Sequence, residues 1–196
     1  MSEVAIVLGL SDTQRAAAAA LLLEAFSAKL GPLAGRGPSG ERVIAASLRG
    51  ESCLTATERD RLVGVCGIGR RDADVLQVRL KTLVREFGWL MALPRWLALA
   101  LGRRIVPGSM VRIEYLAVAP DARGRGIGTR LMAAAAELAR REGCCVVLLD
   151  VVDTNPRARA LYERLGYRSV RTQRVPWPSR WLGFGAVTQM ALTLGG

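Results

Sequence analysis

A succession of strand, loop, helix and strand in the second half of the chain constrains the fold more than any other feature of the sequence. Residues 111–118 are predicted to form a strand, and residues 126–141 carry apolar side chains at helical spacing. Gly143 is placed to end that helix. Residues 145–152 are apolar except for Asp150, which is typical of a strand buried on both faces. The sequence therefore predicts an α/β fold.

The remaining elements are shorter, and turn or capping residues bound each of them. Further strands are predicted at residues 4–10, 52–57, 62–68, 167–174 and 186–194. Further helices are predicted after residue 11, at residues 41–48 and at residues 156–165. A capping box of Ser11 and Gln14 starts the first of these helices, and Gly31-Pro32 ends it before a loop that reaches residue 40. Asn155 as N-cap and Pro156 at the first helical position start the last one.

The loop between the strand and the helix carries residues suited to binding an anion. Its sequence is Arg123-Gly124-Arg125-Gly126-Ile127-Gly128-Thr129. Glycines let the backbone approach a ligand, and the start of a helix adds a positive dipole end with unpaired N–H groups. Arginines at 123, 125 and 130 add formal charge and would repel each other without an anion. We expect a pyrophosphate site here, and the alternative is a glycine-rich turn that binds nothing.

Two other pyrophosphate sites fit this loop less well. A nicotinamide dinucleotide site requires G-x-G-x-x-G directly after the strand, whereas Thr129 replaces the third glycine here and five residues separate Val118 from Gly124. Asp150 does follow at the expected distance, but too few residues remain after Asp153 to complete a doubly wound domain. A Walker loop requires Gly-Lys-Ser/Thr, and this loop contains no lysine.

Two motifs resemble those of the GNAT N-acetyltransferases. Residues 123–128 have the pattern Arg-x-x-Gly-x-Gly after the strand segment 114–120, and they look like the acyl-CoA loop of that family. Residues 155–167 resemble its later Asn-x-x-Ala-x-x-Leu-Tyr-x-x-x-Gly-Phe/Tyr segment. The resemblance is firm over residues 111–170 and only topological over residues 1–70.

The resemblance implies a single N-acetyltransferase domain over residues 1–196, with acetyl-CoA as co-substrate and no metal. It implies a mixed, mostly antiparallel sheet, splayed between its fourth and fifth strands and flanked by helices. Residues 71–108 lie outside this basic pattern, and we expect them to form a helical insertion between the third and fourth strands. Pantetheine would lie in the splay. The implied cofactor-binding residues are Leu116, Ala117, Val118, Arg123, Gly124, Arg125, Gly126, Ile127, Gly128, Thr129 and Asn155. For Asn155 a helix N-cap is an equal alternative.

The implied reaction is direct attack of a primary amine on the thioester in a ternary complex, with two side chains that transfer protons. Glu114 would deprotonate the ammonium, directly or through water. Tyr162 matches the family's general acid for the leaving thiolate. Backbone N–H at Val118 would stabilise the developing oxyanion. The alternatives are that Glu114 pairs with Arg112 or another arginine, and that Tyr162 is a core tyrosine beside Ala158 and Leu165.

Composition excludes several other chemistries. The chain of 196 residues contains no histidine, which removes Ser-His-Asp, Cys-His and His-zinc mechanisms. Cys53, Cys66, Cys144 and Cys145 match no zinc spacing, and we expect four reduced thiols in a cytoplasmic protein. No signal peptide is expected from the first residues.

The net charge of +11 indicates an anionic partner, and three kinds of partner are possible. The excess lies in residues 70–104 and 122–174, and a basic surface suits a polyphosphate ligand, nucleic acid or a membrane. No nucleic-acid motif accompanies the charge, and aromatic residues make up only 5%. We therefore expect an amine acceptor and no nucleic acid. The alternatives are a non-catalytic acyl-CoA-binding module and a basic protein that contacts membrane or nucleic acid.

Residues 71–108 do not fit the pattern of the rest. Apolar residues recur at spacings of three and four, which predicts two amphipathic helices broken near Pro94. Residues 88–102 contain one charged residue, Arg95, but fall short of the roughly 20 apolar residues of a spanning helix. Four interpretations remain: a lid whose Trp89, Met91 and Trp96 wall the acceptor site, a homodimer surface, a contact with an anionic membrane, or a helix pair packed on its own domain.

Overall fold

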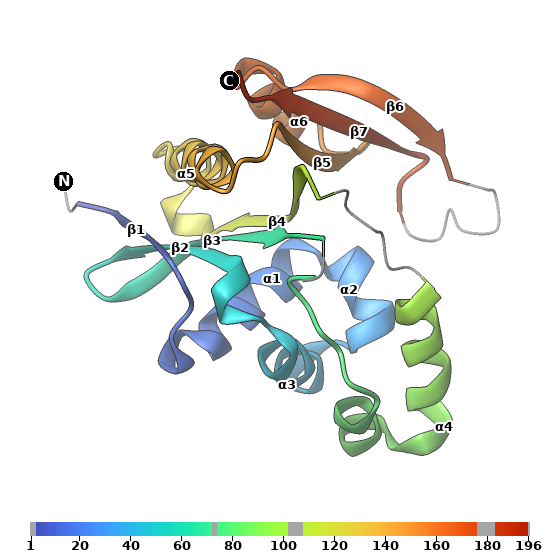
Figure 1. The fold of residues 1–196 in the computed structure, drawn as a ribbon. Helices are drawn as coiled ribbons and strands as arrows, with labels where there is room; N and C mark the ends of the chain where they lie inside the picture. Colours follow the sequence, from blue (N-terminus) through green and yellow to red (C-terminus); the bar gives the residue numbers. More distant parts are fainter. Residues whose placement is uncertain (1–2, 72–73, 102–107, 176–182, 196) are drawn as a thin grey trace.

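Seven strands form one sheet in the computed structural model, which describes residues 3–71, 74–101, 108–175 and 183–195 (Figure 1). The strands are β1 Ala5–Leu8, β2 Cys53–Glu58, β3 Arg61–Gly69, β4 Met110–Val118, β5 Val146–Val152, β6 Arg168–Arg174 and β7 Ala186–Thr193. Their order is β1-β2-β3-β4-β5-β7-β6, and every neighbouring pair is antiparallel except the parallel pair β4–β5. The expectation of a mixed, mostly antiparallel sheet is confirmed.

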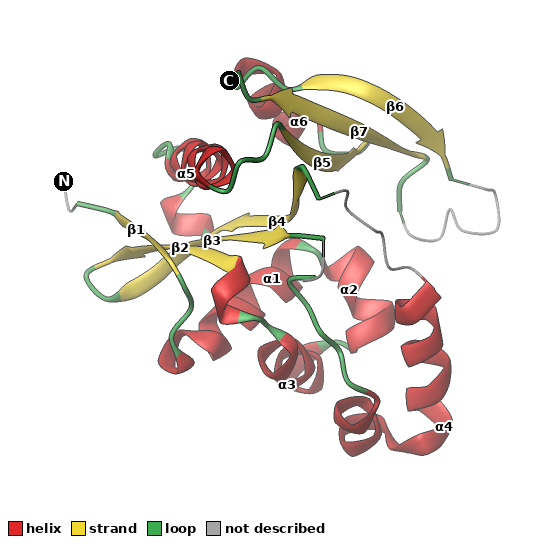
Figure 2. Ribbon diagram, in the orientation of Figure 1, coloured by secondary structure: helices red, strands yellow, loops and turns green. Residues whose placement is uncertain are grey.

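Helices cover both faces of the sheet (Figure 2). One face carries α1 Arg15–Ala25, α2 Ser27–Ala34, α3 Gly37–Ser47 and α4 Leu80–Leu101, and the other carries α5 Ile127–Arg141 and α6 Pro156–Arg164. Short 3-10 turns lie at Asp12–Gln14, Gly50–Ser52 and Pro120–Ala122. Each layer of helices packs a separate hydrophobic core against its face of the sheet. Leu131, Met132 and Leu149 are fully buried under α5, while Leu22 and Ile44 are fully buried under α1 and α3.

The first helix differs from its prediction, because it is two helices with a bend between them. The capping box of Ser11 and Gln14 is present, but α1 ends at Ala25 and Phe26 leaves the helical region at φ −122° and ψ 30°. The Phe26 ring packs edge-on against Tyr115, with centroids 5.3 Å apart. The chain then continues as α2 through Pro32, so the prediction that Gly31-Pro32 ends the helix, with a loop to residue 40, is wrong.

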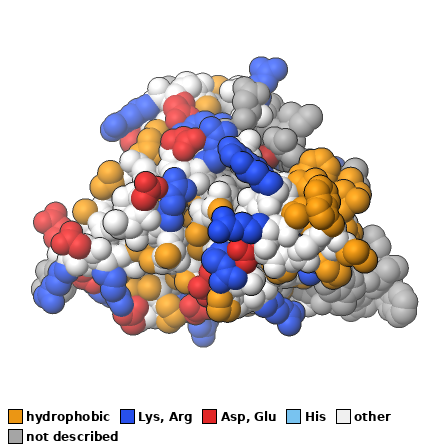
Figure 3. Space-filling view, turned by 90° about the horizontal axis from the view of Figure 1, so that it is seen from below, with side chains coloured by type: hydrophobic (Ala, Val, Ile, Leu, Met, Phe, Trp, Pro, Cys, Tyr) orange, Lys and Arg blue, Asp and Glu red, His pale blue; other side chains and the backbone are white. Residues whose placement is uncertain are grey.

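The inserted segment also breaks at a different residue from the one predicted. Gly88 has φ 72° and ψ 167°, a conformation that favours glycine and interrupts α4, whereas Pro94 lies inside the second half of the helix. The predicted break near Pro94 is therefore wrong. Apolar side chains on this second half contribute to the patch at one end of the surface in Figure 3.

No single helix in the described ranges is long and apolar enough to cross a membrane. Only the pair Asp12–Ala25 and Ser27–Ala34 passes a test of length and composition, and these two helices are bent by 115°.

Candidate active site

The sheet opens between β4 and β5. Their parallel pairing runs from Met110 opposite Val146 to Ile113 opposite Leu149 and then stops. On the other side of β4, Gly67 pairs with Tyr115 and the next residue, Ile68, pairs with Ile113. Glu114 is therefore an extra residue in β4, a β-bulge, and bulges bend a strand away from its neighbour. This bulge lies where the splay expected from the sequence begins.

Beyond the bulge, alternate backbone groups of β4 point toward this opening, and one of them, the Val118 carbonyl, accepts from Arg123 Nε. The Ala119 N–H donates to the Val63 carbonyl at 2.9 Å, so the backbone groups of Ala119 point toward β3. Because these groups alternate along a strand, those of Ala117 also point toward β3, while those of Leu116 and Val118 point toward β5. Of the three β4 residues expected to bind the cofactor, Leu116 and Val118 thus expose backbone groups to the opening and Ala117 does not.

The glycine loop leads directly into the N-terminus of α5. Gly124 and Gly126 both have φ 76°, a left-handed conformation that explains glycine at each position. The Arg130 N–H donates to the Gly126 carbonyl at 3.0 Å, which is the first hydrogen bond of the helix. The N–H groups at residues 127–129 consequently have no partner within the helix, and the helix dipole is positive there. This end of α5 is suited to a phosphate group.

The arginines of the loop do not depend on an external anion. Arg125 donates to both carboxylate oxygens of Glu58, at 3.0 and 2.5 Å. The Arg123 Nε donates to the Val118 carbonyl at 3.0 Å, and Arg130 donates to the Val4 carbonyl at 2.8 Å. The expectation that these side chains repel each other without an anion is therefore wrong, because acceptors within the chain hold them apart.

The bulge places the Glu114 carboxylate against the strand next to it. A Cβ at Gly69 would collide with Glu114 Oε1, and the Val75 N–H donates to Glu114 Oε2 at 3.3 Å. Burial raises the pKa of Glu114 from 4.5 to about 7, and the nearby Asp74 carboxylate adds to the rise while the Val75 N–H opposes it. Arg112, the partner considered for Glu114, donates instead to Asp150 at 3.0 Å. The structure therefore holds a carboxylate able to gain or lose a proton near neutral pH.

Tyr162 lies on α6, in the core on the other face of the sheet from α1–α4. It is only 9% exposed, and its ring lies 6.1 Å from that of Tyr167, centroid to centroid. Burial, with a smaller effect from the Cys66 thiol, raises the pKa of Tyr162 to about 12, so its phenol keeps its proton at neutral pH. Cys66 is opposite Leu116 in the β3–β4 register. Tyr162 packs in the core under α5, whereas Glu114 contacts Gly69 and Val75 on the side of the inserted segment.

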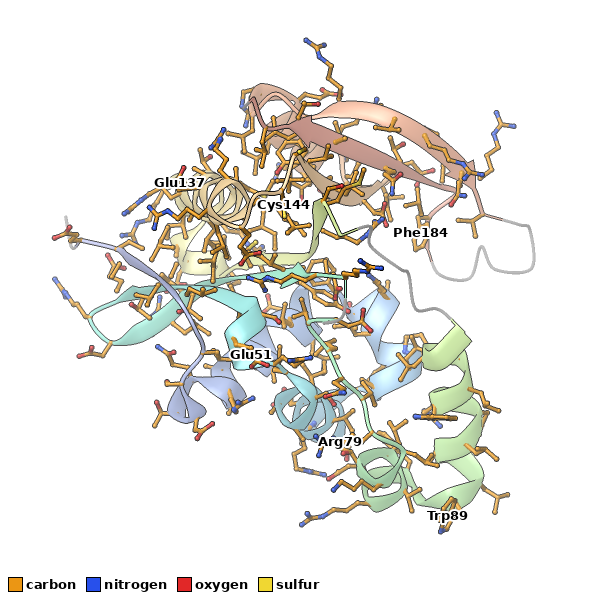
Figure 4. The ribbon with its side chains drawn as sticks, viewed as in Figure 1. Glu51, Arg79, Trp89, Glu137, Cys144 and Phe184 are labelled. Atoms are coloured by element: carbon orange, nitrogen blue, oxygen red, sulfur yellow. The ribbon has the colours of Figure 1, made fainter. Side chains whose placement is uncertain are left out.

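The other predicted site residues lie in two places: Asn155 at the start of α6, and Trp89 and Trp96 on α4. Asn155 Oδ1 accepts from the Ala158 N–H at 3.1 Å, so Asn155 is the N-cap of α6, and the cap leaves its side-chain NH₂ group as a donor. Trp96 packs partly buried against the core under α1–α3. Trp89 is 66% exposed and lies just after the kink of α4 at Gly88, in the part of the helix far from the sheet (Figure 4). The structure does not bring Trp89 together with Glu114, and an acceptor-binding role for the two tryptophans stays a prediction.

Sequence reasoning missed two residues that shape the site. Gly69 leaves room for the Glu114 carboxylate, and Asp74 raises the pKa of that carboxyl. A glycine inside a predicted strand is a weak signal of close approach by a neighbour. Nothing local to Asp74 in the sequence indicates that it lies near Glu114.

Comparison with known proteins identifies the family of the chain. The model of the acetyltransferase (GNAT) family matches residues 22–167. The chain is 37% identical over 70 residues to thialysine N-epsilon-acetyltransferase of Bos taurus, which covers 36% of this chain and 41% of that protein. It is 44% identical over 55 residues to streptothricin acetyltransferase of Streptomyces lavendulae, which covers 28% of this chain and 29% of that protein. These matches span less than half the length of the relatives.

Solved structures resemble the chain over nearly its whole length. The ribosomal-protein-S18-alanine N-acetyltransferase of Escherichia coli superposes with a TM-score of 0.61 at 19% identity, covering 99% of this chain and 97% of that one. A Salmonella typhimurium protein solved with its cofactor acetyl-CoA gives a TM-score of 0.64 at 17% identity, covering 98% and 94%. At these identities the likeness establishes the fold.

Proposed function

Because the chain belongs to the acetyltransferase (GNAT) family, we propose that it transfers an acetyl group from acetyl-CoA to a primary amine by direct attack in a ternary complex. One arrangement supports the proposal: β4 carries Glu114, parts from β5 beyond Ile113 and leads to the free N-terminus of α5, while Tyr162 lies in the core on the same face as α5. A carboxylate near neutral pKa on one side and a protonated phenol on the other are the two groups that amine acylation requires.

The residues present fit acetyl-CoA. The backbone N–H and carbonyl of Leu116 and the backbone N–H of Val118 can bond an extended pantetheine as a further strand would. The N–H groups of residues 127–129 can bind its diphosphate, because they lie at a helix N-terminus after two left-handed glycines. The side-chain NH₂ of Asn155 is a further donor for pantetheine. When bound, acetyl-CoA supplies the acetyl group as a thioester.

The chain's own residues supply the proton transfers. Glu114 accepts a proton from the ammonium of the acceptor, because its raised pKa lets it do so near neutral pH. The Val118 N–H donates a hydrogen bond where negative charge develops on the carbonyl oxygen. As the C–N bond forms and the C–S bond of the thioester breaks, Tyr162 would donate its proton to the leaving sulfur, and the second proton released by the nitrogen would restore the phenol. No side-chain nucleophile is needed.

A thiol-release assay with a panel of amines tests the activity. The panel should include thialysine, streptothricin and a peptide with an N-terminal alanine, because these acceptors appear in the names of the similar proteins. Acetyl-CoA and longer acyl-CoAs serve as donors. Continuous CoA release with any amine supports the proposal. Acetyl-CoA binding without amine-dependent release would indicate a non-catalytic acyl-CoA-binding module instead.

We also propose a cytoplasmic location, supported by the state of the thiols. Cys53, Cys66, Cys144 and Cys145 are all unpaired, and burial raises the pKa of Cys66 to about 12, which keeps that thiol protonated. Labelling of free thiols in cell fractions tests this location, and recovery of the protein from an oxidising compartment would contradict it.

A further inference from the structure

The second half of α4 is apolar on both of its faces. Toward the protein, Ala92 is fully buried and Trp96 and Leu99 pack partly buried against the core. Away from the protein, five large apolar side chains are exposed: Trp89 66%, Leu90 92%, Met91 51%, Leu93 46% and Leu97 47%. A helix that is apolar all round is normally covered on both faces. In the described part of the chain, the outer face of this helix has no cover.

Two features keep the outer surface of this half of α4 apolar: the kink at Gly88 and the position of Arg95. The left-handed Gly88 turns the second half of α4 away from the first, whose Leu83 is fully buried. Arg95 is the only charged residue from Gly88 to Leu101. Its guanidinium lies over the Phe87 ring at 4.9 Å and donates to the Met91 carbonyl at 2.8 Å. The arginine is thus folded back along the helix.

Positive charge lies next to this apolar face. Arg79, Lys81 and Arg85 are exposed just before the kink. The acidic residue of this stretch, Glu86, accepts from Arg42 at 2.7 Å, so its charge is balanced from within the chain. Basic side chains are visible on the same face as the apolar patch in Figure 3. The surface combines exposed apolar side chains with an excess of cations.

We propose that this surface, formed by Trp89, Leu90, Met91, Leu93 and Leu97 with Lys81 and Arg85, docks on the surface of an anionic lipid bilayer. Short apolar helices with basic neighbours lie in the interface of such membranes, and tryptophan favours that depth. A second copy of the chain is a poorer partner, because pairing identical patches would bring together two sets of cations on chains of net charge +11.

Docking in this way is compatible with the proposed acyl transfer and does not depend on it. The acetyl-CoA loop leads into α5, which covers the face of the sheet opposite to α4 (Figure 1). A chain lying on lipid through α4 would therefore keep the N-terminus of α5 in water.

Co-sedimentation with vesicles tests the apolar part of the surface. The full chain should bind vesicles of phosphatidylcholine with phosphatidylglycerol and should not bind phosphatidylcholine alone. Leu90→Glu should weaken binding by about tenfold or more, because a leucine side chain no longer enters the interface. Val170→Glu is the matched control, since Val170 is 61% exposed on β6 and the substitution changes the net charge equally. No binding by the wild type, or equal losses in both variants, would overturn the proposal.

A second pair of variants tests the charge. Lys81→Gln with Arg85→Gln should weaken binding to anionic vesicles by roughly tenfold, whereas Arg168→Gln with Arg171→Gln on β6 should change it little. High salt should release the wild type. Sedimentation velocity without lipid distinguishes the second-copy alternative. A dimer that Leu90→Glu converts to monomer, and that Val170→Glu leaves intact, would assign the surface to self-association and overturn membrane docking.

Discussion

At the scale of single residues, Glu114 has the most unusual environment of the candidate site. Its carboxylate lies over Gly69, and burial raises its pKa to about 7. If it is the base, the wild-type rate should rise with pH up to about 7, as the carboxyl loses its proton, and then level off. Glu114→Gln should remove this acidic limb and lower kcat by roughly 10²–10⁴. A pH–rate profile measures both, and an unchanged acidic limb in the variant would show that another group is the base.

Gly69 gives a separate test of where that carboxylate must lie. Gly69→Ala adds a methyl group that collides with the Glu114 side chain, which is flexible enough to move aside without unfolding the protein. We expect kcat to fall while acetyl-CoA affinity is retained. In a double-mutant cycle, adding Gly69→Ala to Glu114→Gln should cost little more, since the carboxylate is already gone. Fully additive losses would mean that Gly69 acts independently of Glu114.

Tyr162 has a conservative variant that removes only its hydroxyl. Tyr162→Phe should keep the ring packing against Tyr167 and leave acetyl-CoA affinity nearly unchanged. Loss of the proton donor should lower kcat by about 10²–10⁴. Steady-state kinetics with acetyl-CoA titrations separate the two effects. Wild-type kcat in this variant would assign Tyr162 to the core alone.

At the scale of elements, the N-terminus of α5 is the part that should recognise phosphate. A carboxylate at position 126 would face the diphosphate of the ligand and would also replace a glycine with φ 76°. Acetyl-CoA should raise the Tm of the wild type, because it binds only the folded state, and Gly126→Asp should abolish that shift. Gly143→Asp is a suitable control, since Gly143 has φ 70° at the other end of α5. Equal ligand-induced shifts in both variants would contradict the assignment.

The elements also show which interactions a sequence reveals. The loop 123–129 and the Asn155 cap depend on neighbouring residues, so both could be predicted from the local pattern. The bend at Phe26 could not, because a tertiary contact accompanies it: Phe26 packs against Tyr115 on a distant strand. Local preference indicated breaks at the prolines instead. The break in α4 falls on a glycine, a local signal that the proline pattern concealed.

The contrast between local and long-range contacts also explains how much of the candidate site could be predicted. Glu114 and Tyr162 could be named as candidates from the motifs around them. Their environments could not be predicted, because Asp74, Gly69 and Cys66 act on them from other segments of the chain. The protein partners of the loop arginines escaped prediction for the same reason, since Glu58 lies on a separate hairpin.

At the scale of the whole molecule, the buried carboxyl should link global stability to pH. The pKa of Glu114 is about 7 in the folded chain against an ordinary 4.5, so folding favours its protonated form. The stability that this contributes is fully present below about pH 4.5 and is lost as pH rises through 7. Glu114→Gln should therefore be more stable than the wild type above pH 7, by roughly 1–3 kcal/mol given partial solvent exposure, and the gain should vanish in acid. Denaturant unfolding across pH measures it, and a pH-independent difference would refute the linkage.

The bulge at Glu114 has a consequence for how such a chain can evolve. Before and after the bulge, successive side chains of β4 point alternately into the two cores. Val111, Ile113, Leu116 and Val118 lie in the core under α5, and Tyr115 and Ala117 lie in the core under α1–α3. If position 114 were deleted, every remaining residue of the strand would keep its face, and the ladder with β3 would become regular. Loss of a single codon would thus remove the carboxylate without disturbing the hydrophobic pattern. If Glu114 is the base, catalysis and foldability are genetically separable at this position, so inactive but well-folded descendants of such a protein lie one short deletion away.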